Sequence, residues 1–279
     1  MLEVVFLIVL GLIWVGVASW GDLKTREVPN WLNFSLIIFA LGFRFFYCLF
    51  SENNFMFLYQ GLIGLGIFFI IGNLLYYGRM FAGGDAKLMI ALGAVLPFSE
   101  NFYINLNIFF LFLFAFFFVG AIYGLVISLF LGLRNFKKFK KEFFRQFKKN
   151  RKLVYCSMIL GLILMVLGFV EGLLLFLGVL LFVLPYLYLY AKSVDEVCMV
   201  KKVKVNELTE GDWLYKDVKI GSRIIKKSWN GLSRKEIKLI KRHKKQVVIR
   251  QGIPFVPVFL ISFLVLIYLW LNKLWYPFW

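Results

Sequence analysis

The sequence predicts a polytopic α-helical membrane protein of about eight spans with a small cytoplasmic α+β appendage. Hydrophobic residues make up 61% of the 279 residues and the mean hydropathy is +0.81, values outside the range of soluble globular proteins. Apolar runs of about 18 residues, enough to cross a bilayer, recur along the chain. We expect spans at 4–20, 31–50, 57–77, 107–133, 153–169, 173–191 and 253–271, with a shorter one at 85–98.

The distribution of basic residues supports these spans and gives their orientation. With the N-terminus outside, the inside segments are 21–30, 78–87, 134–152 and 192–252, and they hold 31 of the 33 Lys and Arg residues. This is the positive-inside asymmetry of membrane proteins, and it accounts for the net charge of +18 without a nucleic-acid partner. Basic residues beside the cytoplasmic leaflet attract anionic lipid, so we expect inner-leaflet lipid as a partner of the protein.

The spans divide the chain into three predicted parts. Residues 1–191 form a helical membrane domain, 192–252 a cytoplasmic α+β segment, and 253–279 the last span and an outer C-terminus. Within the first part, aromatic residues recur with helical period through 134–152 while charges fill the other face. This pattern is typical of a helix lying in the membrane interface, with a docking surface for a partner protein as the alternative.

Local sequence signals predict the content of the appendage. Short β-branched runs alternate with turn residues at Glu210-Gly211-Asp212 and Asn230-Gly231. Ser233 and Glu236 have the spacing of a capping box, so one helix is expected to start there. These signals predict a small α+β appendage that contains one helix.

Two aspartates stand out, because a carboxylate at the edge of an apolar span is costly. Asp22 ends the first span and Asp85 opens the fourth, so the predicted topology puts both at one depth on the inner side. Two adjacent carboxyl groups can share a proton, and one can then activate water while the other protonates a peptide carbonyl. The alternative is structural, with Asp85 as a helix cap and Asp22 as an ion-pair partner of Lys24 or Arg26.

Small residues precede the second aspartate. Gly83 and Gly84 lead into Asp85, and we expect them to provide positive φ or close contact with an extended substrate strand. The three cysteines, Cys48, Cys156 and Cys198, show no CxxC spacing and have no nearby His, so we expect no metal or cofactor.

Two short motifs resemble those of the type IV prepilin peptidases. The stretch "GDLKTREVPNWLN" is similar to their first motif, in which an Asp at the end of the first span precedes Ile/Val-Pro-Asn, and "AGGDAKLMIALG" is similar to their Gly-x-Gly-Asp-x-Lys motif. The region 205–263 also looks like the C-terminal part of the archaeal branch, the preflagellin and prepilin peptidases. The resemblance implies Asp22 and Asp85 as the catalytic pair. It also assigns Gly83, Gly84, Lys87, Pro29 and Asn30 to substrate positioning or the active-site loop.

The sequence departs from the family pattern in two respects. Ala82 replaces the first Gly of the second motif, which puts the loop conformation in doubt because Ala resists positive φ. The tetracysteine zinc segment and the methyltransferase half of the bacterial enzymes have no counterpart, so the resemblance implies peptidase activity alone.

We interpret the sequence as an aspartic endopeptidase of the cell membrane that removes short basic leaders from prepilins or preflagellins at the cytoplasmic face. A small ion- or proton-coupled transporter that uses Asp22 and Asp85 as a relay is one alternative. A non-enzymatic pilus assembly factor that docks through its basic region is another. The sequence leaves open the choice between pilin and archaellin substrates, the cleavage site, which Asp is protonated and the oligomeric state.

The orientation is testable by cysteine accessibility in intact and permeabilised cells. Single cysteines within 134–152 and 192–252 should react only after permeabilisation, whereas cysteines at Glu52 and Glu100 should react in intact cells. Labelling of 192–252 from outside would contradict both the orientation and an inner position for the two aspartates.

Overall fold

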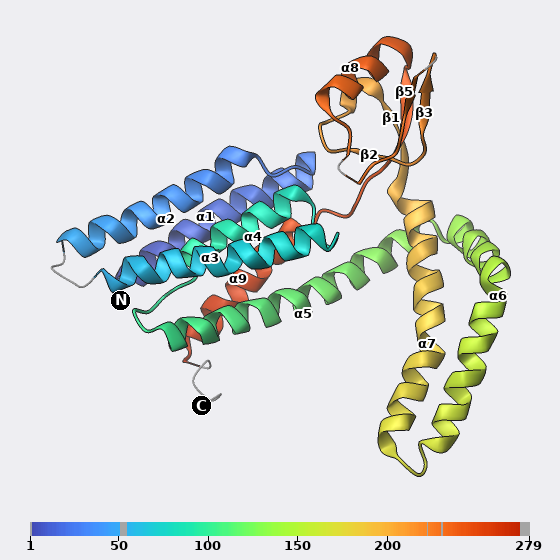
Figure 1. The fold of residues 1–279 in the computed structure, drawn as a ribbon, viewed down its shortest axis with the longest axis horizontal. Coiled ribbons are helices and arrows are strands. Elements are labelled where there is room, and N and C mark those ends of the chain that lie inside the picture. Colours follow the sequence, from blue (N-terminus) through green and yellow to red (C-terminus); the bar gives the residue numbers. More distant parts are fainter. Residues whose placement is uncertain (1, 51–54, 222, 230, 274–279) are drawn as a thin grey trace. The chain divides into compact units, whose positions relative to one another are not determined.

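The structure is a computed structural model that describes residues 2–50, 55–221, 223–229 and 231–273. The chain forms two compact units, which are considered separately (Figure 1). One unit comprises Met1–Gly124 and Pro254–Trp279, and the other comprises Leu125–Ile253. The predicted positions Glu52 and Asn230 lie outside the described residues.

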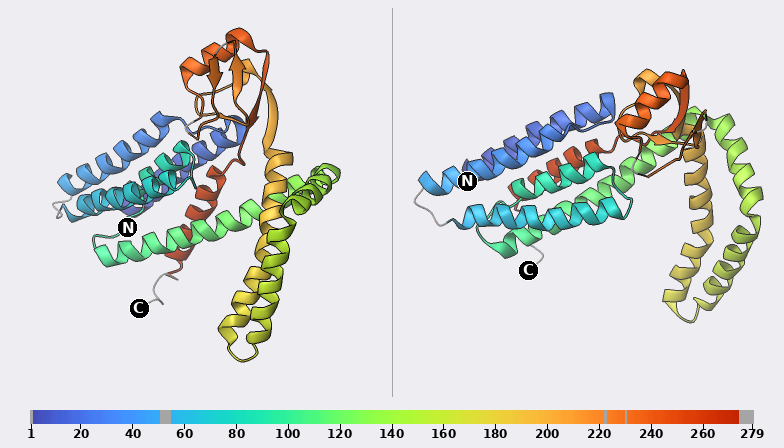
Figure 2. Two further views of the ribbon diagram at one scale, coloured as in Figure 1. Left: turned by 45° about the vertical axis from the view of Figure 1, so that its right-hand side comes forward. Right: turned by 45° about the horizontal axis from the view of Figure 1, so that its top comes forward.

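The first unit is a bundle of helices (Figure 2). Its elements are α1 (Leu2–Thr25), α2 (Asn30–Phe50), α3 (Met56–Tyr77), α4 (Gly83–Val95), the first part of α5 (Phe102–Arg134), and α9 (Val256–Leu271). One end of this bundle carries the C-termini of α1 and α3 and the N-termini of α2, α4 and α9, and we call it the site end. The helical membrane architecture predicted from the hydropathy is confirmed.

Six helices in the described part of the chain are long and apolar enough to cross a membrane. The remaining two predicted spans are shorter, since α9 has 16 residues and α4 has 13. A helix of 13 residues rises about 20 Å, which is less than the roughly 30 Å of a bilayer core. The span expected at 85–98 is therefore a short helix, and the non-helical residues 96–101 complete the return to α5 (Figure 1).

Glycines allow α3 to pack closely against α4. A Cβ placed on Gly93 of α4 would lie 2.6 Å from the carbonyl oxygen of Gly64, and a Cβ on Gly64 would collide with the Gly93 carbonyl. A Cβ on Gly72 would lie 2.7 Å from the side chain of Ile90. The glycines thus make α3 a central packing helix, because small residues let helix backbones approach in lipid.

Two long helices and a small α+β part make up the second unit. Its elements are α6 (Phe136–Leu167), α7 (Gly172–Val194), a π-helix (Asp195–Met199), β1 (Val200–Lys204), a 3-10 turn (Val205–Glu207), β2 (Trp213–Leu214), β3 (Val218–Ile220), β4 (Arg223–Ile225), α8 (Arg234–His243) and β5 (Gln246–Arg250). The strands form an antiparallel sheet of order β1-β5-β2 and a β3-β4 hairpin. The α+β content predicted for 192–252 is confirmed.

The structure also contains the capping box and the glycine turns that the sequence predicts for the α+β part. The hydroxyl of Ser233 accepts the backbone N–H of Glu236, while the Glu236 carboxylate accepts the backbone N–H of Ser233, so the capping box is present. Gly211 and Gly231 have φ of +98° and +74°, as their turns require. Ile237 and Ile240 of α8 are buried in the apolar core of this part together with Ile249 of β5.

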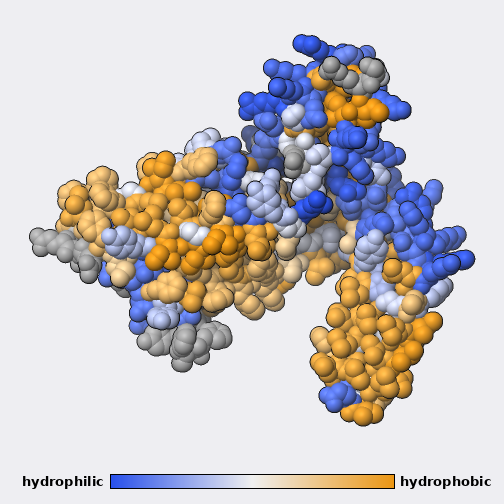
Figure 3. Space-filling view, viewed as in Figure 1, coloured by the Kyte–Doolittle hydropathy of each residue, from blue (hydrophilic) through white to orange (hydrophobic). Residues whose placement is uncertain are grey.

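The helix α6 changes character at a kink. Asn150 has non-helical backbone angles (φ −107°, ψ 16°), and it separates the basic, aromatic half from the apolar half. This break coincides with the predicted boundary between the segment 134–152 and the following span. In Figure 3, hydrophobic surface covers the lower part of the α6–α7 hairpin and hydrophilic surface covers the basic half. Interfacial placement and contact with anionic lipid stay predictions.

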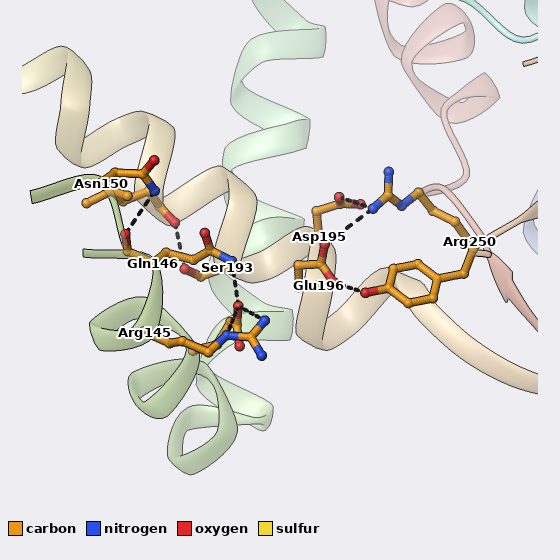
Figure 4. Close-up of polar contacts among 10 residues, drawn as sticks. Arg145, Gln146, Asn150, Ser193, Asp195, Glu196 and Arg250 are labelled. Atoms are coloured by element: carbon orange, nitrogen blue, oxygen red, sulfur yellow. Dashed lines mark hydrogen bonds and ion pairs between the residues drawn. The ribbon is translucent and has the colours of Figure 1, made fainter. Parts of the chain in front are cut away.

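A charged cluster joins β5 to the end of α7 (Figure 4). The guanidinium of Arg250 lies 3.0 Å from the Asp195 carboxylate and 3.6 Å from that of Glu196. The hydroxyl of Tyr215 donates to Glu196 over 2.7 Å. These contacts fasten the sheet to the helical hairpin within the unit Leu125–Ile253. The functional division of the chain at residue 191 stays a prediction.

We expect Gly64→Ala to destabilise the protein, because the added methyl group meets the α4 backbone at Gly93. Overpacking of this kind costs about 1–3 kcal/mol. Gly66→Ala is the matched control, since a Cβ on Gly66 has no neighbour within 4 Å. Thermal unfolding in detergent should show a lower midpoint for Gly64→Ala only, and equal midpoints for the two variants would contradict the packing described.

Candidate active site

Asp22 lies in the last turn of α1, where it is buried with a relative exposure of 7%. Its Oδ2 accepts the backbone N–H of Val256 over 2.9 Å, and Val256 is the first residue of α9. The hydroxyl of Ser19, one turn earlier, donates to the Val256 carbonyl oxygen. Asp22 therefore satisfies a free N–H at the start of α9, because the first N–H groups of a helix have no partner within it.

Asp85 is the third residue of α4, and it is partly buried. Its Oδ2 accepts the backbone N–H of Ala82 over 3.3 Å, which is half of a capping box. A carboxylate in the first helical turn also interacts favourably with the helix dipole. The sequence of small residues followed by Asp thus produces a helix start that points a carboxylate back toward the site end.

The two carboxylates lie within electrostatic range of each other. Helix α1 packs against α4, and the charge of Asp22 acts on Asp85. Two carboxyl groups that come into contact can hold one proton between them. The arrangement at the site end of the bundle is therefore compatible with the shared-proton chemistry considered from the sequence.

Residues of the two motifs contact each other at two further points. The Lys87 ammonium donates to Oδ1 of Asn30 over 2.7 Å, which joins α4 to the start of α2. A Cβ on Gly84 would lie 3.4 Å from the Cβ of Val28. Pro29 follows in the same loop, and its carbonyl accepts the N–H of Leu32 in the first turn of α2. The structure thus gathers all seven predicted site residues at the site end.

The positive-φ alternative for the two glycines is wrong. Gly83 and Gly84 are the first two residues of α4 and are not among the positive-φ glycines. Close contact of these glycines with a substrate strand stays a prediction. Ala82 has φ −72° and ψ 161°, which any residue adopts, so its replacement of Gly carries no strain.

Positive φ occurs instead at two arginines near the site. Arg26 follows α1 and Arg79 follows α3, and each has φ of 60°. Arg79 terminates α3 in a Schellman-type arrangement, in which the N–H of Met80 bonds to the Leu75 carbonyl. Glycine is usual at this position. With arginine there instead, no residue pattern indicated the left-handed turn.

The C-terminal part of the site was also missing from the sequence interpretation. Tyr123 of α5 donates to the carbonyl oxygen of Pro254 over 2.9 Å and lies within electrostatic range of Asp22. Val256 begins α9 two residues after Pro254, more than 230 residues after Asp22 along the chain. No local sequence pattern indicated this partner.

The structure also gives Asp22 a structural role, which was the alternative to catalysis. Asp22 caps α9, and Arg26 is close enough to attract its charge electrostatically. Within the described residues, no group of three or more His, Cys, Asp or Glu side chains is arranged to hold a metal ion. The functional groups described at the site end include two carboxyl groups, the Lys87 ammonium and the Tyr123 hydroxyl.

Comparison with known proteins finds a family match for part of the chain. Residues 9–125 match the type IV leader peptidase family. The matched segment contains most of α1, all of α2 to α4 and both aspartates, so the resemblance seen in the motifs is confirmed there. The resemblance noted for 205–263 lies outside the matched segment and stays a prediction.

Curated relatives agree with this assignment. The preflagellin peptidase of Methanocaldococcus jannaschii is 32% identical over 89 residues, which is 32% of this chain and 37% of that protein. The preflagellin peptidase of Methanococcus voltae is 32% identical over 88 residues, with the same coverage. Prepilin peptidase EppA of Methanothermobacter thermautotrophicus is 33% identical over 84 residues, 30% of this chain and 22% of that protein. The chain thus spans well under half the length of these relatives, and no solved structure matches it.

The contact between Gly84 and Val28 leads to a prediction at this site. Gly84→Ala should fold and retain its site geometry, because 3.4 Å is an ordinary contact distance for a Cβ. Gly84→Val should displace the Val28–Asn30 loop, because its branched side chain meets Val28. Ala82→Gly is the control, since Ala82 has unstrained angles. Protease sensitivity of the loop should rise for Gly84→Val alone, and an unchanged cleavage pattern would show that this contact does not hold the loop.

Proposed function

We propose that the chain is an aspartic endopeptidase of the membrane that removes short basic leader peptides from prepilin-like or preflagellin-like precursors. The observation that carries this proposal is the placement of Asp22 and Asp85 at one end of the bundle, inside the segment that matches the leader peptidase family. The names of the relatives, preflagellin and prepilin peptidases, support the class of substrate.

The proposed reaction uses the two carboxyl groups as base and acid. The ionised aspartate removes a proton from water, which attacks the scissile carbonyl carbon, while the protonated aspartate donates its proton to the carbonyl oxygen. The tetrahedral intermediate then collapses and the C–N bond breaks. The departing amine takes up the proton held by the aspartate that acted as base, and the other aspartate recovers a proton from a hydroxyl of the intermediate. Asp22 is fixed by α9 and Asp85 by the start of α4, so both groups are held in place before substrate binds.

The surroundings of the site suit hydrolysis at a membrane surface. Trp20, Trp31 and Tyr77 lie near the ends of α1, α2 and α3 at the site end, and each is more than 60% exposed. Aromatic side chains of this kind prefer the interface between lipid and water. The site end therefore sits where water is present and where a membrane-anchored precursor can place the peptide that follows its basic leader.

The orientation belongs to the proposal as well. The basic loops and the site end face the cytoplasm of the cell membrane, with the N-terminus outside, in agreement with the positive-inside rule. Precursor proteins are the proposed partners. The basic loops are proposed to lie beside anionic lipid of the inner leaflet. A relay of protons or ions through Asp22 and Asp85 would need a path across the bundle, and the buried core of Phe68, Phe112 and Phe116 does not favour one.

Substitution of each aspartate tests the proposal. Asp22→Asn and Asp85→Asn should each abolish cleavage of a precursor by the purified protein in detergent, because either change removes the base or the acid. Asn keeps the shape of the side chain, so folding is checked by the thermal midpoint. Cleavage within about tenfold of wild type, equal to about 1.4 kcal/mol in the barrier, would exclude that aspartate from the chemistry.

A further inference from the structure

A buried arginine lies at the other end of α4. Arg44 of α2 has a relative exposure of 0%. Its guanidinium donates to the carbonyl oxygens of Ala94 (3.1 Å), Val95 (3.4 Å) and Pro97, at the C-terminal end of α4. It also donates to the carbonyl of Phe57 over 2.9 Å and lies 4.2 Å from the centre of the Phe57 ring.

The shortness of α4 explains why these carbonyls need a partner. The last four carbonyl groups of a helix accept no hydrogen bond from within the helix. With 13 residues, α4 is too short to bring these carbonyls to the far membrane surface. Non-helical backbone at membrane depth is tolerated only where protein groups satisfy it. Arg44 meets this need with several donors in one plane, which the single ammonium of a lysine cannot reproduce.

The neighbouring residues leave space for the Arg44 side chain and hold the segment that follows α4. A Cβ on Gly61 of α3 would lie 2.6 Å from Cδ of Arg44, so Gly61 leaves room for the side chain. The amide of Asn105 donates to Gln60 and to the Ser99 carbonyl and accepts the Ser99 N–H, which holds the next part of the return segment. Buried polar side chains from α2, α3 and α5 thus secure the chain from residue 94 to residue 99.

We propose that Arg44 is a positioning residue that fixes the depth of α4 and, through it, the position of Asp85 relative to Asp22. The helix α2 holds α4 at two points, since Asn30 accepts from Lys87 near one end and Arg44 donates at the other. If the Arg44 contacts are lost, α4 can slide or tilt along α3, and the carboxylate at its start moves with it. The kinetic part of this inference rests on the proposed peptidase function.

Kinetics of purified full-length variants test the inference. Arg44→Gln should lower kcat about tenfold or more with KM nearly unchanged, and it should shift the pH profile of kcat, because the spacing of two coupled carboxyl groups changes. Arg44→Lys should recover part of kcat, since it keeps the charge and three donors. Leu36→Ala is the matched control: Leu36 is fully buried on the same helix, and its loss lowers the thermal midpoint without moving the pH profile.

A cross-linking measurement makes the inference independent of activity. In a chain with Cys48, Cys156 and Cys198 replaced by alanine, Asp22→Cys and Asp85→Cys should be joined by a short bifunctional thiol reagent in membranes. Adding Arg44→Gln, or Arg44→Lys if the glutamine variant does not fold, should lower the yield several-fold, and Leu36→Ala should not.

The outcomes separate the two proposals. A wild-type protein that cleaves no precursor but whose cross-link depends on Arg44 leaves the positioning role standing and overturns the peptidase function. Normal cleavage with a kcat, pH profile and cross-link yield that do not respond to either Arg44 variant overturns the positioning role. A fall in the thermal midpoint alone, with kcat per folded molecule unchanged, overturns it as well.

Discussion

The position of α4 depends on the polar contacts that α2 makes with it. A helix of 13 residues cannot anchor itself at both surfaces of a bilayer, so its depth has to be set by protein groups. Lys87 reaches Asn30 near the start of α4, and Arg44 reaches the carbonyls at its end. Close packing along α3, through Gly64 and Gly93, then removes the remaining freedom. Asp85 has a defined position only because these constraints act together.

Asp22 obtains its position from a different part of the chain. Its carboxylate accepts the first N–H of α9, so the last helix of the described chain is joined to the first. The helix α9 lies outside the segment that matches the leader peptidase family, yet it contacts α1 along its length. The matched segment therefore contains both aspartates, but Asp22 is held in place by α9, which lies outside that segment.

Much of this could be predicted from the sequence, for reasons that differ from element to element. Long apolar runs and the capping box at Ser233 are local signals, and they gave α1, α2, α3 and α8 correctly. The pairing of Asp22 with Asp85 required the topology, which the placement of Lys and Arg supplied. The contacts of Asp22 with α9 and of Arg44 with α4 join distant residues, and no local pattern indicates such partners. In the sequence, Arg44 was visible only as a basic residue within the predicted span 31–50.

The two ends of α4 show how one short helix can present a carboxylate at a membrane surface. A helix carries partial positive charge at its N-terminus and partial negative charge at its C-terminus. Asp85 lies at the first and Arg44 at the second, so both charges complement the helix dipole. The N-terminal end can stay open to water and substrate because the C-terminal end, which lies in the protein interior, has its carbonyls satisfied by Arg44. A longer, fully spanning helix would not need a buried cation, and a short helix without one would leave its carbonyls without partners.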